Sequence, residues 1–142
     1  MIAIGSDHGG FALKQAVIAH LEQRGLAYKD FGTYNTESCD YPDYGRAVAK
    51  AVAAGDCEKG IVICTTGIGI SITANRVPGI RAALCGDCFS AQMTRLHNDA
   101  NVLALGAAVT GEGLALKITD TFLDTAFSGE ERHSRRIAKI EG

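Results

Sequence analysis

The chain has 142 residues, of which 46% are hydrophobic and 21% are charged, and its formal net charge is -2 at pH 7. This length and composition are typical of a single globular domain spanning residues 1–142. The slightly acidic balance gives no general basic field, so we expect no nucleic-acid partner, and no apolar run approaches the roughly 20 residues of a membrane span.

Strand-like apolar segments alternate with amphipathic helical segments along the whole chain. The strand patterns cover 1–4, 28–31, 60–64, 80–85 and 101–105. The helical patterns cover 11–21, 43–54, 70–75, 89–97 and 114–127, and a charged helix is expected within 129–142. Gly25 and Gly55 are expected to end the first two helices. This alternation indicates βαβ units. We therefore predict a Rossmann-like α/β fold, a three-layer sandwich around a doubly wound parallel sheet of about five strands, with a C-terminal helix.

Reactive or polar residues follow several of the predicted strands. These clusters are Asp7-His8-Gly9-Gly10, the segment from Cys64 to Gly69, and the turn from Cys85 to Cys88. Ligands in such folds bind at the carboxyl ends of the strands, which lie along one edge of the sheet. We therefore expect these clusters to converge.

Cys64 ends the clearest strand and is followed by Thr-Thr-Gly-Ile-Gly. Glycines allow a tight turn that points several N–H groups into one concavity beside a helix N-terminus, where a carboxylate, a phosphate or an enolate oxygen binds. The same positive end favours a thiolate, which serves as a base or nucleophile. On spacing alone, an inert buried strand cysteine is an equal alternative. The loop is neither a Walker A loop nor a complete G-x-G-x-x-G.

Several other polar residues have a structural explanation beside a chemical one. Asp7 can cap the first helix, whereas His8 next to it is harder to explain by capping. His97 ends a helix, where the dipole favours a cation, or it performs acid–base chemistry. Arg132 and Arg136 share a helix face, which suits a solvated surface or a grip on one phosphate.

The cysteine pattern bears on both redox chemistry and cell compartment. The chain has five cysteines, which is an odd count, and the segment that starts at Met1 does not have the basic and apolar pattern of a signal peptide. We therefore expect reduced thiols in a cytoplasmic protein. Cys85 and Cys88 form a C-x-x-C pair, which suggests a thiol redox protein, but the surrounding sequence lacks the aromatic and proline context of that motif. No second such pair completes a zinc site.

Taken together, these segments resemble the type B ribose-5-phosphate isomerases and the related galactose-6-phosphate isomerase subunits. The matching segments occur in family order over nearly the whole chain: 5–11, 40–44, 63–71, 74–76, 79–83, 90–92, 95–103 and 132–133.

The resemblance implies metal-free, cofactor-free aldose–ketose isomerisation of a phosphorylated sugar by a homodimer or tetramer with active sites at the subunit interface. By resemblance, Cys64 is the base and His97 opens the sugar ring, and we expect Asp7 and His8 to gather with His97 around Cys64. Thr66 and the backbone from Gly67 to Ile70 would stabilise the enediolate. The remaining substrate-binding residues that the resemblance implies are Asp7, His8, Tyr41, Thr65, Gly67, Ile68, Gly69, Asn98, Arg132, His133 and Arg136.

Two residues depart from the common family pattern. Thr65 replaces the first glycine of Cys-Gly-Thr-Gly-Ile-Gly, and Ala108 stands where many members have a phosphate-binding arginine. The second change raises the alternative of another phosphorylated aldose, of the galactose 6-phosphate, allose 6-phosphate or erythrose 4-phosphate type; Arg135 is a possible substitute for the missing guanidinium. A non-catalytic phosphosugar-binding module, with Cys64 inert, is a further alternative.

Overall fold

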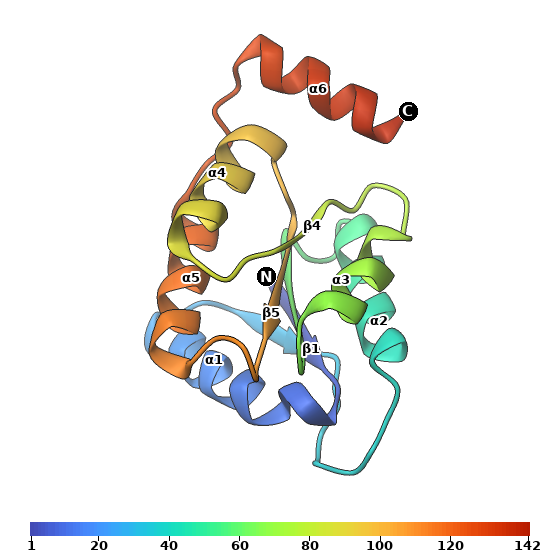
Figure 1. Cartoon of the computed structure of the whole chain (residues 1–142), viewed down its shortest axis with the longest axis vertical. Helices are drawn as coiled ribbons and strands as arrows, with labels where there is room; N and C mark the ends of the chain where they lie inside the picture. Colours follow the sequence, from blue (N-terminus) through green and yellow to red (C-terminus); the bar gives the residue numbers. More distant parts are fainter.

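Strands and helices alternate along the chain in the computed structural model, which describes residues 1–142 (Figure 1). The strands are β1 (Ile2–Ser6), β2 (Tyr28–Asp30), β3 (Lys59–Cys64), β4 (Ala82–Leu84) and β5 (Val102–Gly106). The helices are the short 3-10 turn η1 (His8–Gly10) and α1 (Phe11–Gln23), α2 (Tyr41–Ala53), α3 (Ile68–Asn75), α4 (Cys88–Asn98), α5 (Glu112–Asp124) and α6 (Glu131–Glu141). Every predicted strand and helix is present, and no helix is long and apolar enough to cross a membrane.

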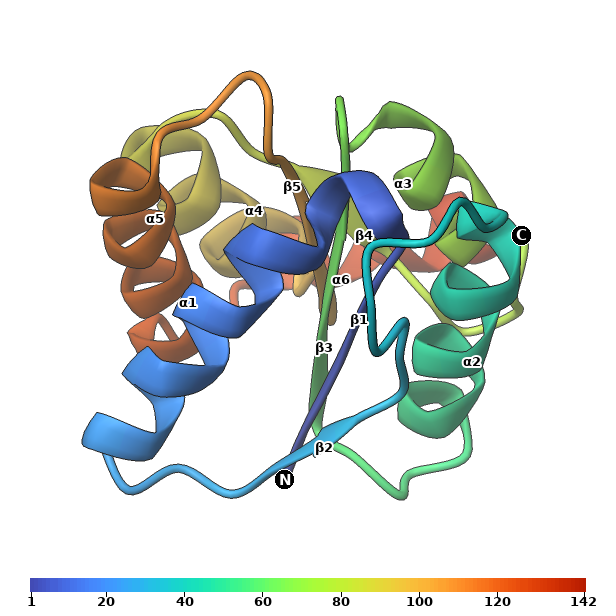
Figure 2. The same ribbon diagram turned by 90° about the horizontal axis from the view of Figure 1, so that it is seen from below.

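The five strands form one parallel sheet in the order β2-β1-β3-β5-β4. Helices α2 and α3 cover one face, and α1, α4 and α5 cover the other, so the sheet is the middle of three layers (Figure 2). The predicted doubly wound α/β sandwich is confirmed. Gly25 and Gly55 take the left-handed backbone conformation just after α1 and α2, where they end those helices as predicted.

Strand β3 lies in the centre of the sheet and is buried on both faces. Ile61 and Ile63 enter the core beneath α1, α4 and α5, whereas Val62 and Cys64 enter the core beneath α2 and α3. A continuous apolar run is the pattern that a parallel strand with two covered faces requires. The side chain of Cys64 therefore points to the α2–α3 side of the sheet.

The fourth strand is shorter than its apolar pattern, 80–85, predicts. The Ile80 N–H donates to Val77 O in a turn (3.1 Å), and the Arg81 N–H donates to the Asn101 side chain (2.9 Å), so pairing begins only at Ala82. On its outer side β4 has no neighbouring strand. There the Asn75 amide accepts from the Ala82 N–H (2.7 Å) and donates to Ala82 O (3.0 Å).

The order of the strands defines where a ligand binds in this fold. From β1 the chain first moves outward to β2 and later crosses to β3 on the other side of β1. The resulting switch point lies between the carboxyl ends of β1 and β3, which is where doubly wound sheets form ligand crevices. Ser6 and Cys64 end these two strands.

Candidate active site

Cys64 is placed at the start of α3 by the glycine turn that follows β3. Cys64 is 4% exposed, and the Gly67 N–H donates to its sulfur at 3.1 Å. Gly67 has φ 79° and precedes the first residue of α3. A side chain there would need the left-handed conformation and would also strike β5, so this turn requires glycine. The sulfur therefore lies against a helix N-terminus, as the loop pattern predicts.

A cavity of about 470 Å³ opens beside Cys64. Its lining unites most of the predicted site residues of this edge: Asp7, Tyr41, Cys64, Thr65, Thr66, Ile68, Gly69 and Ile72. The Tyr41 ring covers Gly69 so closely that a methyl group at Gly69 would lie 2.5 Å from it. The predicted convergence is therefore confirmed for the clusters that follow β1 and β3, whereas the turn from Cys85 to Cys88 does not line this cavity. The lining also includes Ile72, which sequence reasoning missed because nothing in its pattern separates it from a core residue.

Asp7 and His8 follow β1 on the other side of the switch point. Asp7 caps η1, because its Oδ1 accepts the Gly10 N–H at 3.0 Å, and it also borders the cavity. His8 is exposed, and its Nδ1 accepts the backbone N–H of Cys39 at 3.2 Å. With Nδ1 accepting, the neutral ring carries its proton on Nε2, which leaves a donor facing solvent. No sequence signal indicated the contact between His8 and Cys39.

The segment that carries Cys39 is anchored by a buried lysine that sequence reasoning also missed. Lys14 is completely buried, and its Nζ donates to Asp30 Oδ1 at 2.6 Å and to Thr33 O. The Thr33 N–H in turn donates to Ser6 O at 2.6 Å. A buried charge needs such partners, so this set holds the loop after β2 against the end of β1.

Thr65, which departs from the family pattern, packs directly over Gly9. A methyl group at Gly9 would lie 2.2 Å from Thr65 Oγ1. The hydroxyl therefore occupies the space that is open because Gly9 has no side chain. The backbone of Thr65 is held in position by a hydrogen bond, since its carbonyl accepts the Ala108 N–H at 2.9 Å.

This contact makes Gly9 and Thr65 energetically coupled. Replacing Gly9 by alanine is expected to lower the free energy of unfolding by about 1 kcal/mol, because Thr65 must leave its rotamer. In a Thr65→Gly background the same replacement is expected to cost little. Urea denaturation of the four proteins of this double-mutant cycle measures the coupling, and equal costs in both backgrounds would contradict the contact.

The other predicted site residues lie at the opposite edge of the sheet. Helix α4 starts after the carboxyl end of β4 and runs back, so His97 and Asn98 at its end lie where β5 begins. Helix α6 lies beyond this end of α4, at the top of Figure 1, away from the start of α1. Within one chain, the expected gathering of His97 with Asp7 and His8 around Cys64 does not occur. The reason is topological: a crossover helix returns to the edge where its next strand begins.

The site residues thus form two half-sites. The carboxyl-edge half-site comprises Asp7, His8, Tyr41 and the segment from Cys64 to Gly69. The amino-edge half-site comprises His97, Asn98, Arg132, His133 and Arg136.

Two stacked imidazoles form the centre of the amino-edge half-site. The rings of His97 and His133 lie 4.3 Å apart between centroids, with an angle of 15° between their planes. His133 is the buried residue of α6, whereas Arg132 and Arg136 are exposed on the same helix. Burial lowers the pKa of His133, and its neighbours His97 and Arg132 lower it further.

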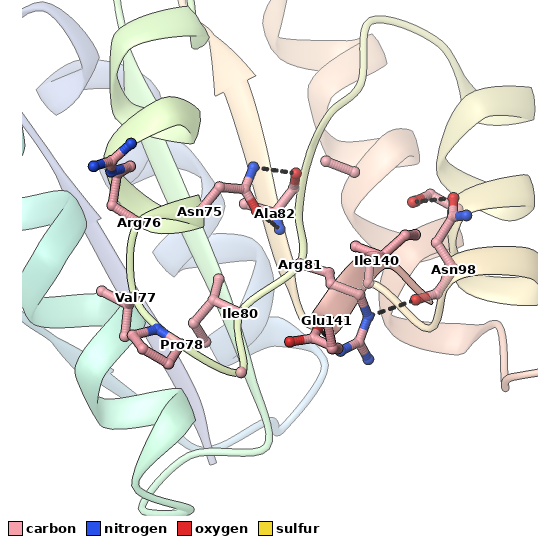
Figure 3. A pocket seen from close by; sticks show the side chains of 14 residues that line it. Asn75, Arg76, Val77, Pro78, Ile80, Arg81, Ala82, Asn98, Ile140 and Glu141 are labelled. Atoms are coloured by element: carbon pink, nitrogen blue, oxygen red, sulfur yellow. Dashed lines mark hydrogen bonds and ion pairs between the residues drawn. The ribbon is translucent and has the colours of Figure 1, made fainter. Parts of the chain in front are cut away.

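A cavity of about 770 Å³ lies next to this half-site (Figure 3). The end of α3, strand β4 and the end of α6 line it, and Asn98 is the site residue that reaches it. Arg81 connects the end of α4 to the end of α6. It donates to Asn98 O (2.8 Å) and Asp99 O (2.9 Å) at the end of α4 and to Glu141 Oε1 (2.8 Å) on α6. The end of α6 is therefore tied to the end of α4.

Ala108 lies beside Thr65, so the position of the family's arginine is at the carboxyl edge of the sheet, the edge that carries Cys64. Arg135, a possible substitute, lies on α6 at the amino edge and donates to Glu131 at 2.7 Å. Within one chain, Arg135 therefore does not replace the missing guanidinium.

The C-x-x-C pair does not have the properties of a reactive dithiol. Cys85 is 2% exposed, and burial, assisted by Asp87, raises the pKa of its thiol to about 11. All five cysteines are free thiols. The thiol form of Cys85 therefore persists to high pH, which disfavours thiolate exchange.

Alkylation tests this property directly. At pH 8, iodoacetamide is expected to modify the partly exposed Cys39 and Cys88 and to leave Cys85 unmodified until the protein unfolds. Peptide mass mapping of native and urea-treated samples measures the difference. Rapid modification of Cys85 in the native protein, or an easily formed Cys85–Cys88 disulfide, would restore the redox hypothesis.

The sequence as a whole identifies the class of protein that this fold and these half-sites define. A family model described as Ribose/Galactose Isomerase matches residues 2–140. The chain belongs to this family, and the resemblance stated above is confirmed.

Particular relatives are similar over nearly their full length. The chain is 50% identical to ribose-5-phosphate isomerase B of Escherichia coli (strain K12), over 98% of this chain and 93% of that protein. Its structure resembles that of Clostridium thermocellum ribose-5-phosphate isomerase B, with a TM-score of 0.97 and 56% identity over 99% of this chain and 94% of that chain. The type B ribose 5-phosphate isomerase of Trypanosoma brucei has a TM-score of 0.95 and 46% identity, over 99% and 95% of the two chains.

Proposed function

We propose that this protein interconverts ribose 5-phosphate and ribulose 5-phosphate through an enediolate, with Cys64 as the base. The observation that carries the proposal is the position of the Cys64 sulfur, held by the Gly67 N–H at the start of α3 and facing a cavity lined by hydroxyl and carboxylate groups. Relatives that are named for this reaction are similar along the whole chain.

The carboxyl-edge half-site contains the groups that proton transfer beside a carbonyl requires. The Cys64 thiolate takes the proton from C2 of the open-chain aldose and returns it to C1 of the enediolate. The N–H groups of Gly67 and Ile68 already donate to the Cys64 sulfur and to Thr66 Oγ1. The N–H groups of Gly69 and Ile70, in the first turn of α3, donate to no protein acceptor and are left for the enediolate oxygen.

Ring opening and phosphate binding fall to the amino-edge half-site. His97 moves a proton between the ring oxygen and the anomeric hydroxyl, which is suited to an imidazole near neutral pH. Arg132 and Arg136 are one helical turn apart on the exposed side of α6, where they bind the phosphate together. Asp7, His8, Tyr41 and Asn98 bind the sugar hydroxyls.

A complete site needs a second copy of the chain. Helix α3 extends from the carboxyl-edge half-site to the cavity at the amino edge, and its outer face exposes Ile68 (53%) and Ile72 (60%) one turn apart. Leu84 is also exposed, on the neighbouring strand β4. If two copies pack these faces about a twofold axis, antiparallel α3 helices bring each carboxyl-edge half-site to the amino-edge half-site of the other copy. We therefore include a homodimer with shared active sites in the proposal, acting in the cytoplasm.

A panel of aldose phosphates tests the function. Purified protein is incubated with ribose 5-phosphate, erythrose 4-phosphate, allose 6-phosphate and galactose 6-phosphate, and ketose formation is followed by NMR. We expect ribose 5-phosphate to have the highest kcat/KM. A higher value for another sugar would assign the substrate to that aldose and would make Ala108 the first position to examine. Binding without turnover of any sugar would favour the phosphosugar-binding module.

A further inference from the structure

The contact between His97 and His133 points to a role for His133 that differs from phosphate binding. The side chain of His133 is 8% exposed, whereas that of Arg132 beside it is 60% exposed. The buried face of its ring lies against His97 in a nearly parallel stack. A phosphate bound by the exposed arginines would therefore meet little of the His133 side chain.

The ring of His97 is otherwise free to turn. No hydrogen bond reaches either of its ring nitrogens from this chain, and the side chain is exposed at the end of α4. By contrast, the ring of His133 is held by burial, since its side chain is 8% exposed, and by its Nε2, which lies 3.4 Å from Glu130 Oε2. A fixed ring stacked on a free ring restricts the free one to a single plane.

We propose that His133 is a positioning residue that holds the imidazole of His97 in the plane required for opening the sugar ring. The inference rests on the proposed function, since it assigns a partner to the residue that opens the ring. The restraint is expected to raise the rate of ring opening, because a catalytic group held near its reactive geometry loses less entropy in the transition state.

The charges around the pair fit this role. The charged neighbours of His133 are Glu130, which caps α6, and Arg132 and Arg136 on α6, and its neighbour on α4 is His97. Burial and the cations lower the pKa of His133, so at neutral pH its ring is uncharged. A neutral ring at His133 suits the stack, because two charged rings at 4.3 Å would repel each other.

Anomer exchange separates ring opening from isomerisation. In a Cys64→Ala background, the proton transfer between C1 and C2 is blocked, but the protein still accelerates the interconversion of the α and β furanose forms of ribose 5-phosphate. Exchange NMR measures this acceleration, and calorimetry measures the Kd for ribose 5-phosphate in the same samples. Wild-type ketose formation, measured separately, tests the proposed function itself.

Two substitutions at His133 distinguish orientation from phosphate binding. Adding His133→Ala is expected to reduce the accelerated exchange about tenfold or more, as His97→Ala does, with Kd unchanged within about threefold. His133→Phe keeps a flat ring for stacking but has no charge or donor, and is expected to retain most of the exchange.

Each other outcome would overturn the proposal. Unchanged exchange in His133→Ala would show that His97 needs no partner, and no acceleration in Cys64→Ala alone would remove the ring-opening step from His97. Equal loss of exchange in both variants, or a Kd raised more than about tenfold in His133→Ala, would make His133 a phosphate ligand or an anchor of α6.

Discussion

Replacement of Cys64 by alanine is expected to lower kcat for ribose 5-phosphate by about 10²- to 10⁴-fold, which is the usual contribution of a positioned general base. Cys64 lines the cavity, and its replacement leaves only the capping carboxylate of Asp7 and the phenol of Tyr41 as titratable side chains in that lining. Coupled assays of ketose formation measure kcat, and calorimetry measures substrate binding, which we expect to persist.

A matched control uses another cysteine of the same chain. Cys88 is partly exposed and lies outside the cavity, so Cys88→Ser is expected to keep kcat within about twofold. Near-normal turnover by Cys64→Ala would remove this cysteine from the base role. Loss of turnover in Cys88→Ser with Cys64 intact would instead revive the redox hypothesis.

Mixing two inactive variants is expected to restore activity if the active sites are shared between protomers. Cys64→Ala and His97→Ala damage opposite half-sites, so a dimer with one copy of each has one intact site and one doubly damaged site. When the variants are unfolded together and refolded at equal amounts, about half of the dimers are mixed, and about a quarter of wild-type activity is expected. Size-exclusion chromatography with light scattering checks that the refolded protein is dimeric.

The control mixture contains two variants of the same half-site, Cys64→Ala and Cys64→Ser, which cannot complement each other. If the mixture of Cys64→Ala and His97→Ala stays as inactive as this control while dimers form, the two half-sites do not meet across an interface. The amino-edge residues would then not act together with Cys64 in a site shared between protomers.

The elements of the fold could be predicted because their signals are local. The apolar run of β3 and the glycines after α1 and α2 act within a few residues, and each is found where the pattern places it. The position of Cys64 follows from the same signals, since a cysteine at the end of a central parallel strand must lie at the ligand-binding edge.

The placement of His97 required a step beyond local pattern. A residue at the end of a crossover helix has returned to the edge where the strands begin, so His97 could not meet Cys64 within one chain. By contrast, the stack of His97 on His133 and the burial of Lys14 against Asp30 depend on how distant segments pack. Charged and polar residues on amphipathic segments are ordinarily exposed, and nothing in the sequence marks these as exceptions.

The side chain of Asn75 has a consequence for how copies of this chain associate. The outer edge of β4 is the kind of edge that recruits a strand from another molecule, but the amide of Asn75 makes with Ala82 the donor and acceptor pair that such a strand would make. The sheet is thereby closed to continuous growth across molecules. Continuous growth needs both edges of the sheet, β2 and β4, so covering the β4 edge permits a closed pair of copies and gives no template for a fibril.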